Sequence, residues 1–101
     1  MSKAPKIENL ISLVQRSLSN GDYVFTGHAN QRLQHREVTR LEVKQVLKSG
    51  FHEKRKDKYD DTYGSWNYSI SGKTLDMRAL RIVISFDEDG MLIVTVIDIS
   101  K

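Results

Sequence analysis

The sequence predicts an α+β fold, with two to three N-terminal helices packed on one face of a C-terminal antiparallel sheet of about four strands. Two patterns predict this fold class. Apolar residues recur at helical spacing in the first half of the chain and alternate with polar residues in the second half. Turn-forming residues separate these stretches, and no repeat or linker divides the chain. We therefore expect one domain over residues 1–101.

The first helix is expected over residues 5–20, where apolar side chains recur three and four positions apart. Pro5 suits the first turn of a helix, because its missing N–H would have no partner there. Gly21 suits the left-handed conformation that commonly ends a helix. Residues 23–25 are then expected to form a short extended connector.

Residues 27–50 are expected to hold the second and third helices. Thr26 can cap the second helix with its hydroxyl. Thr39 and Glu42 have the spacing of a capping box, in which each side chain accepts a hydrogen bond from the other residue's N–H. The third helix is expected to end at Gly50.

Residues 51–99 are expected to form the antiparallel sheet. The segment 51–58 is highly charged, which is typical of an exposed edge strand. Turns are expected at 71–73 and at 87–90, where Gly90 allows a positive φ. The expected strands cover 51–58, 63–71, 80–86 and 91–97.

The net charge of +3 is unevenly distributed along the chain. Residues through Lys58 include 12 basic and 6 acidic side chains, whereas those from Tyr59 onward include 4 basic and 7 acidic ones. A basic first half favours a polyanionic partner, nucleic acid first. A soluble surface with uneven charge accounts for this observation equally well.

Several classes of site are excluded or disfavoured. The chain has no cysteine, which excludes disulfides, thiolate zinc sites and iron–sulfur clusters. It has no glycine-rich phosphate loop, and His28, His35 and His52 lack carboxylates at a known metal-ligand spacing. We therefore expect no metal and no cofactor. No signal peptide is recognisable, and the longest apolar run, 91–94, is too short to cross a bilayer, so a cytoplasmic protein without a membrane partner is expected.

The most informative motif is a basic stripe, which we define as His28, Arg32 and Arg36. These residues are four positions apart and therefore share one side of the second helix. Two guanidinium groups at this spacing suit a phosphate chain, because each presents a planar fork of donors. A solvated basic face without function is the alternative, and the spacing alone favours it.

A second group of candidates lies on the predicted sheet. Aromatic side chains there, Tyr63, Trp66 and Tyr68, could stack on unpaired bases. The alternative is that the aromatic residues belong to the core and that the edge lysines prevent aggregation. The remaining candidates are all basic: Lys54, Lys56, Lys58, Arg78 and Arg81.

These residue types suffice for cleavage of RNA without a metal. RNA supplies its own nucleophile, the 2′-hydroxyl. An enzyme needs only a base for its proton, cations for the phosphate and an acid for the leaving oxygen.

The run from Phe25 to Leu47 resembles an uncharacterised domain family of small bacterial and phage-borne proteins. The hallmark of that family is a helix written H-A-x-x-R-[L/M]-x-x-R, followed by a turn and a helix with V-x-x-[V/I]-L. The resemblance covers residues 23 to 98 and places the chain with RelE/ParE-like and MqsR-like toxins of toxin–antitoxin systems. It implies a RelE-like fold and a metal-independent endoribonuclease. The expected partners are mRNA, either free or associated with the ribosome, and a cognate antitoxin. A departure is Glu37, where the family usually has glycine.

The resemblance assigns roles to the stripe. It implies that His28 transfers a proton or fixes a neighbouring side chain, and that Arg32 and Arg36 bind phosphates and support catalysis. Tyr68 and Arg81 are the further catalytic candidates.

Structural alternatives remain for the same residues. His28 could hydrogen-bond the sheet backbone, and Arg32 could pair with Asp98, an acid in an apolar strand that needs a partner. For the whole chain, the alternative to an enzyme is a non-catalytic module that binds nucleic acid or protein through its basic helices.

Overall fold

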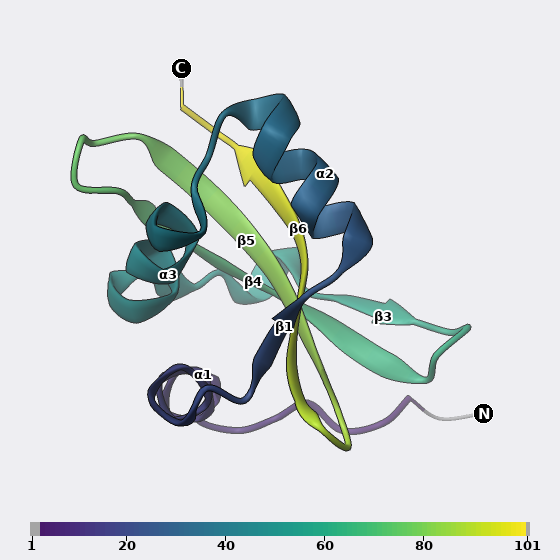
Figure 1. Cartoon of the computed structure of the whole chain (residues 1–101). Coiled ribbons are helices and arrows are strands. Elements are labelled where there is room, and N and C mark those ends of the chain that lie inside the picture. Colours follow the sequence, from purple (N-terminus) through teal and green to yellow (C-terminus); the bar gives the residue numbers. More distant parts are fainter. Residues whose placement is uncertain (1–2, 101) are drawn as a thin grey trace.

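The computed structural model describes residues 3–100, which form three α-helices and six strands, so the predicted α+β class is confirmed (Figure 1). Most of the helical structure precedes the sheet, as the change in apolar periodicity predicts. The elements are α1 (Leu10–Asn20), β1 (Tyr23–Phe25), α2 (Gly27–Arg36), α3 (Arg40–Ser49), β2 (Phe51–His52), the 3₁₀ helix η1 (Lys54–Lys56), β3 (Lys58–Asp60), β4 (Ser65–Lys73), β5 (Ala79–Asp87) and β6 (Gly90–Asp98).

Three long antiparallel strands, β4, β5 and β6, form the centre of the sheet. β1 pairs with β6 in parallel, with Tyr23 opposite Met91, and β2 and β3 pair with β4. The sheet is therefore mixed, and the prediction that 23–25 is only a connector was wrong. Three residues carry too little alternation for a strand to be distinguished from an extended linker.

The apolar core lies between the helices and the sheet. α2 packs against β6, and α3 packs against β4 and β5 (Figure 1). Burying each large aliphatic side chain contributes roughly 1.5–3 kcal/mol. Both layers supply side chains with no exposed surface: Val14, Ala29, Val43, Val46, Leu47, Ile70, Leu80, Ile82, Ile84 and Ile93.

The first helix begins at Leu10, later than the predicted start at residue 5. Asn9 adopts a left-handed conformation with φ 53°, which interrupts a continuous helix. The preceding segment is instead held against the sheet, where the indole N–H of Trp66 donates to the carbonyl of Ala4 at 2.7 Å. The predicted end is confirmed, because Gly21 adopts a left-handed φ of 76°.

Both predicted caps in 27–50 are confirmed. The hydroxyl of Thr26 accepts a hydrogen bond from the N–H of Ala29 at 3.1 Å and so begins α2. The hydroxyl of Thr39 accepts from the N–H of Glu42 at 3.1 Å, and the carboxylate of Glu42 accepts from the N–H of Thr39 at 2.9 Å. Gly50 follows the end of α3, as predicted.

The charged segment 51–58 is not one edge strand, as the sequence predicts, but two short strands separated by η1. Ser69 on β4 explains the interruption. Its carbonyl accepts from the N–H of Glu53 at 2.8 Å, and its N–H donates to the carboxylate of Asp57 at 3.1 Å. Since Glu53 and Asp57 occupy both backbone polar groups of Ser69, the backbone of the three residues between them does not pair with β4 as a strand and forms η1 instead.

The turn predicted at 71–73 is also wrong, because β4 continues through Lys73. Gly72 instead permits a close approach of two backbones: a Cβ atom there would lie 2.9 Å from the Cα of Gly50. The hairpin turn at 87–90 is confirmed, with Gly90 at φ 136°.

Candidate nucleic-acid interface

The basic stripe lies on α2, beside the face that the helix buries. Ala29 and Leu33 are buried in the core, and α2 packs against β6. At 3.6 residues per turn, His28, Arg32 and Arg36 follow one flank of this buried pair. The fold therefore presents the three side chains as one continuous row, as their spacing predicts.

The opposite flank of α2 faces α3. Asn30 lies on that flank, and its side-chain oxygen accepts a hydrogen bond from Nη2 of Arg40 at 2.9 Å. The stripe is therefore turned away from α3. The basic side chains of the two helices form two separate surfaces rather than one patch.

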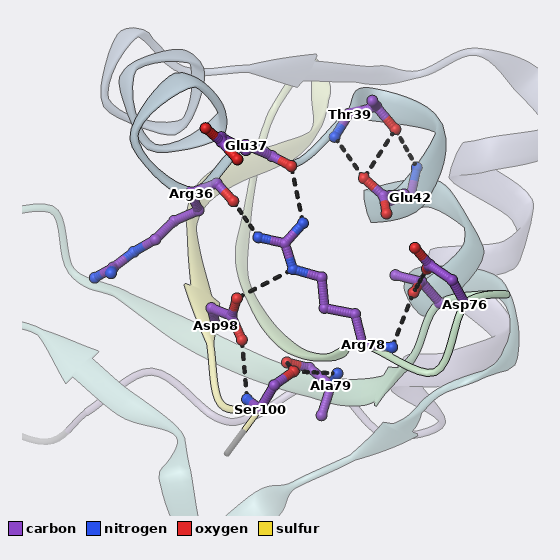
Figure 2. A network of polar contacts seen from close by, with 10 residues as sticks. Arg36, Glu37, Thr39, Glu42, Asp76, Arg78, Ala79, Asp98 and Ser100 are labelled. Atoms are coloured by element: carbon purple, nitrogen blue, oxygen red, sulfur yellow. Dashed lines mark hydrogen bonds and ion pairs between the residues drawn. The ribbon is translucent and has the colours of Figure 1, made fainter.

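The stripe is accessible and forms no ion pair within the part of the chain that the structure describes. His28 and Arg36 are exposed, and Arg32 is half-buried. Within residues 3–100, no carboxylate oxygen lies within 4.0 Å of a side-chain nitrogen of these three residues. The side chain of Arg36 extends away from the polar network beneath the end of α2 (Figure 2). Its guanidinium donors are thus available to an external anion.

Arg78, a predicted phosphate ligand, lies beneath the C-terminal end of α2. Its Nη1 donates to the carbonyl of Glu37 at 2.8 Å and its Nη2 donates to the carbonyl of Arg36 (Figure 2). The last carbonyls of a helix lack partners within the helix and carry partial negative charge, so a guanidinium is well suited to them. Its Nε also donates to Asp98 at 3.1 Å, which corrects the predicted pairing of Asp98 with Arg32.

Arg81, a predicted catalytic residue, is held in an ion pair on the sheet. Its Nε donates to Oε1 of Glu53 at 3.1 Å, and the hydroxyl of Ser71 donates to the same oxygen at 2.6 Å. The hydrogen bond from Ser71, together with the one from Arg81, lowers the pKa of Glu53 to about 2. The charge of Arg81 is therefore balanced within the protein.

The predicted aromatic residues differ in how much of each ring is open. Tyr68, on β4, is 2% exposed and its hydroxyl accepts from the N–H of Ile7 at 2.9 Å. Trp66 is half-buried, with Nζ of Lys6 4.7 Å from its ring centroid. Tyr63 is 81% exposed and is the one of the three with an open ring. Since β5 lies between β4 and β6, Tyr68 does not meet the basic stripe.

The predicted edge lysines, Lys54, Lys56 and Lys58, are exposed on η1 and β3. These elements lie beside β4, whereas α2 packs on β6, at the other side of β5. The predicted site residues therefore do not form one cluster. Arg78 contacts the stripe only through the backbone carbonyl of Arg36, Arg81 is paired with Glu53, and the edge lysines lie on η1 and β3.

A buried polar cluster was missed by the sequence analysis. Nε2 of His52 lies 2.8 Å from Oδ2 of Asp57, and Nζ of Lys6 lies 2.9 Å from the same oxygen. The side chain of Asp57 is 1% exposed, so its charge requires these partners. The sequence gives no sign of this burial, because η1, the turn that brings Asp57 back to His52, carries exposed cations alone.

Residues 3–100 contain no cluster of three or more histidine, aspartate or glutamate side chains that could hold a metal ion. Over the same residues, no helix has the length and apolar character needed to cross a membrane. The stripe itself offers two guanidinium forks that can bind anionic oxygens and an imidazole whose ring nitrogens can donate or accept a hydrogen bond.

Comparison with known proteins identifies a family but no function. No curated protein and no solved structure matches the chain significantly. Residues 25–98 match the family described as "Domain of unknown function (DUF4258)", from the last residue of β1 to the last residue of β6. Membership in an uncharacterised family is thus confirmed, whereas the relation to RelE/ParE-like and MqsR-like toxins remains a prediction. Because the match spans most of the chain and includes the whole stripe, the protein belongs to the DUF4258 family.

Proposed function

We propose that the protein binds RNA through the basic stripe of α2, with Arg32 and Arg36 contacting phosphates. One contrast carries this proposal. Within residues 3–100, neither arginine has a carboxylate within 4.0 Å, whereas Arg78 and Arg81 each have one at 3.1 Å. A guanidinium without an acidic partner keeps its planar fork of donors free for a phosphate.

The charge distribution and the family resemblance both support RNA as the polyanion. The stripe belongs to the half of the chain that carries 12 basic and 6 acidic residues. Cationic surfaces attract nucleic acid by releasing its condensed counterions. The resemblance to RelE-like and MqsR-like toxins, many of which act on mRNA, favours RNA over DNA.

A second function, metal-independent cleavage of the bound RNA, is supported by the position of His28. This exposed imidazole lies in the first turn of α2, one turn before Arg32. It would take the proton of a 2′-hydroxyl, whose oxygen then attacks the adjacent phosphorus. The bond to the 5′-oxygen breaks, a 2′,3′-cyclic phosphate forms, and the leaving oxygen takes a proton from water. Arg32 would stabilise the additional negative charge on the phosphate.

Binding is tested by fluorescence anisotropy with a labelled single-stranded RNA in EDTA. We expect Arg32→Ala and Arg36→Ala each to weaken binding by roughly 10- to 150-fold, as loss of a charged hydrogen bond does. Arg16→Ala is the matched control, because Arg16 is exposed on α1, a helix that packs against α3. Equal affinities for all four proteins would refute binding through the stripe.

Cleavage is tested separately by mapping the 5′ ends of a long mRNA after incubation in EDTA, with and without ribosomes. Discrete cuts that disappear in His28→Ala, while RNA affinity is retained, support the enzyme. Intact RNA under both conditions refutes cleavage and leaves the binding function unaffected.

A further inference from the structure

A groove runs between β1 and α3, on the side of α2 away from the basic stripe. Two adjoining hollows of about 330 and 360 Å³ form it, and Tyr23 and Lys44 line both of them. The remaining lining residues come from β1, α3 and the end of α1: Leu18, Ser19, Val24, Phe25, Arg40, Leu41, Gln45 and Lys48.

The cations of α3 are aligned with the side chains of β1. The guanidinium of Arg40 lies 4.9 Å from the ring centroid of Phe25, and Nζ of Lys44 donates to the hydroxyl of Tyr23 at 3.2 Å. α3 therefore runs antiparallel to β1 along the groove. Lys48 follows one turn further on the same side of α3, because residues four apart share a helix face.

The groove is both apolar and cationic. Val24 is 61% exposed and Leu41 is 63% exposed. None of the residues that line the two hollows is acidic. Moreover, β1 is the terminal strand of the sheet, so within residues 3–100 its outer backbone edge has no strand partner. An unpaired edge of this kind is a template for an added strand.

We propose that this groove binds an acidic, extended segment of a partner protein, which adds to β1 as a further strand. Alternate residues of a strand are about 6.6–6.8 Å apart, and residues four apart on a helix have Cβ atoms about 5–6 Å apart. Carboxylates at alternate positions of the segment therefore match the spacing of Arg40, Lys44 and Lys48. The residues between them lie on the same side as Val24 and are apolar.

Acidic residues near the start of β1 determine which way the carboxylates of the bound segment face. Asp22, Asp87 and Asp89 line a separate hollow of about 260 Å³, which Tyr23 and Val24 also line. Carboxylates of the bound segment would be repelled on that side and attracted on the side of α3. The segment thus has one acidic face and one face with apolar or basic residues.

Two other occupants fit less well. RNA makes no use of Val24 and Leu41, the exposed aliphatic side chains of the groove. A second copy of this chain, paired through β1, would bring the same cations of α3 close to one another, which is unfavourable. The combination of exposed apolar surface, a free strand edge and cations favours an acidic peptide.

The probe is a fluorescein-labelled peptide, Glu-Val-Glu-Val-Glu, measured by anisotropy against the full chain. Two control peptides are Lys-Val-Lys-Val-Lys, which reverses the charge, and Glu-Glu-Glu-Val-Val, which keeps composition but loses alternation. We expect the alternating acidic peptide to bind at least about tenfold more tightly than either control. Lys44→Glu and Leu41→Asp should each lower that affinity about tenfold, while Lys56→Glu, on η1, leaves it unchanged.

Several results would overturn this proposal. One is failure of the acidic peptide to bind at millimolar concentration, and another is equal binding of the non-alternating peptide. A third is a loss of RNA affinity in Lys44→Glu as large as in Arg32→Ala, which would make the groove part of the RNA surface. The fourth is a wild-type dimer, seen by sedimentation, that Leu41→Asp dissociates. Circular dichroism of both variants confirms that they fold, and two independent variants separate a binding defect from misfolding.

Discussion

Arg78 donates a hydrogen bond to the carboxylate of Asp98 at 3.1 Å, and this ion pair joins the loop after β4 to the end of β6. The N–H of Ser100 donates to the other carboxylate oxygen at 2.9 Å, and this bond, with that of Arg78, keeps the pKa of Asp98 below its ordinary value. The two terminal nitrogens of the same guanidinium donate to the carbonyl of Arg36, the last residue of α2, and to that of Glu37, which follows it (Figure 2). One side chain therefore fixes α2, and the basic stripe on it, relative to the sheet.

Replacing Arg78 should destabilise the fold rather than remove a phosphate ligand. Arg78→Ala leaves Asp98 and the two carbonyls at the end of α2 without their donor, so we expect the free energy of unfolding to fall by about 1.5–3 kcal/mol. Arg78→Lys keeps the charge but cannot reach all three acceptors, and should give an intermediate loss. Urea denaturation measures the free energy of unfolding of both variants. Unchanged stability combined with weaker RNA binding would instead make Arg78 a ligand.

The parts of the fold that depend on neighbouring residues could be predicted from the sequence. The caps at Thr26 and Thr39 and the hairpin glycine Gly90 act over a few positions, and the structure confirms all three. The parallel pairing of β1 and the interruption at η1 could not be predicted. Both depend on partners distant in sequence, β6 for the first and the polar groups of Ser69 for the second.

For the candidate site, the sequence identifies the helix face but not how the charges pair. The four-residue spacing places the stripe on one side of α2, because that relationship is local. Whether an arginine is free depends on which carboxylate the fold brings to it. Arg78 and Arg81 are paired with Asp98 and Glu53, and no local pattern distinguishes them from Arg32.

Glu37 is expected to be replaceable by glycine with a gain in stability. Glu37 directly follows α2 and adopts the left-handed conformation, with φ 53°. The family that this chain resembles usually has glycine at this position. That conformation costs a non-glycine residue about 1–2 kcal/mol, whereas glycine adds about 0.4–1 kcal/mol of entropy to the unfolded chain. Glu37→Gly should therefore raise the free energy of unfolding by about 0.5–1 kcal/mol. Gly21→Ala, at φ 76°, is the opposite control and should lower it. A loss of stability in Glu37→Gly would show that the side chain makes a stronger contact.

The two glycines that border α2 and α3 should respond oppositely to alanine. A Cβ atom at Gly50 would lie 2.5 Å from the carbonyl oxygens of Ser71 and Val46, so Gly50→Ala should destabilise the fold by about 1–3 kcal/mol. At Gly27, in the first turn of α2, no described atom outside its chain neighbours and its own helix backbone lies within 4 Å of the added carbon. Gly27→Ala should stabilise the fold by about 0.4–1 kcal/mol, because it restricts the unfolded chain. Thermal denaturation of both variants tests this contrast. Equal unfolding midpoints for the two variants would contradict it.

Glu53 should make stability depend on acid pH. Its pKa is about 2 in the folded protein, below the ordinary 4.5, so the folded carboxylate releases its proton more readily than the unfolded one. The resulting stabilisation is complete above pH 4.5 and decreases as the pH falls towards 2. In Glu53→Gln this contribution is absent, so the stability difference from wild type should shrink between pH 6 and about pH 2. Urea denaturation at several pH values measures it, and a difference that stays constant with pH would contradict the assigned ion pair.

The number of phosphates that the stripe contacts should be measurable from the salt dependence of the RNA-binding constant. For single strands, each neutralised phosphate contributes about 0.7 to the slope of log K against log salt concentration. Arg32→Ala and Arg36→Ala should therefore each reduce the slope by about 0.7, and the double variant by about 1.4. Arg81→Ala is the informative control, since Glu53 already balances its charge: stability should fall while the slope stays unchanged. If the slope is the same in wild type and in the double variant, the phosphates are contacted elsewhere, and the edge lysines of η1 and β3 become the next residues to replace.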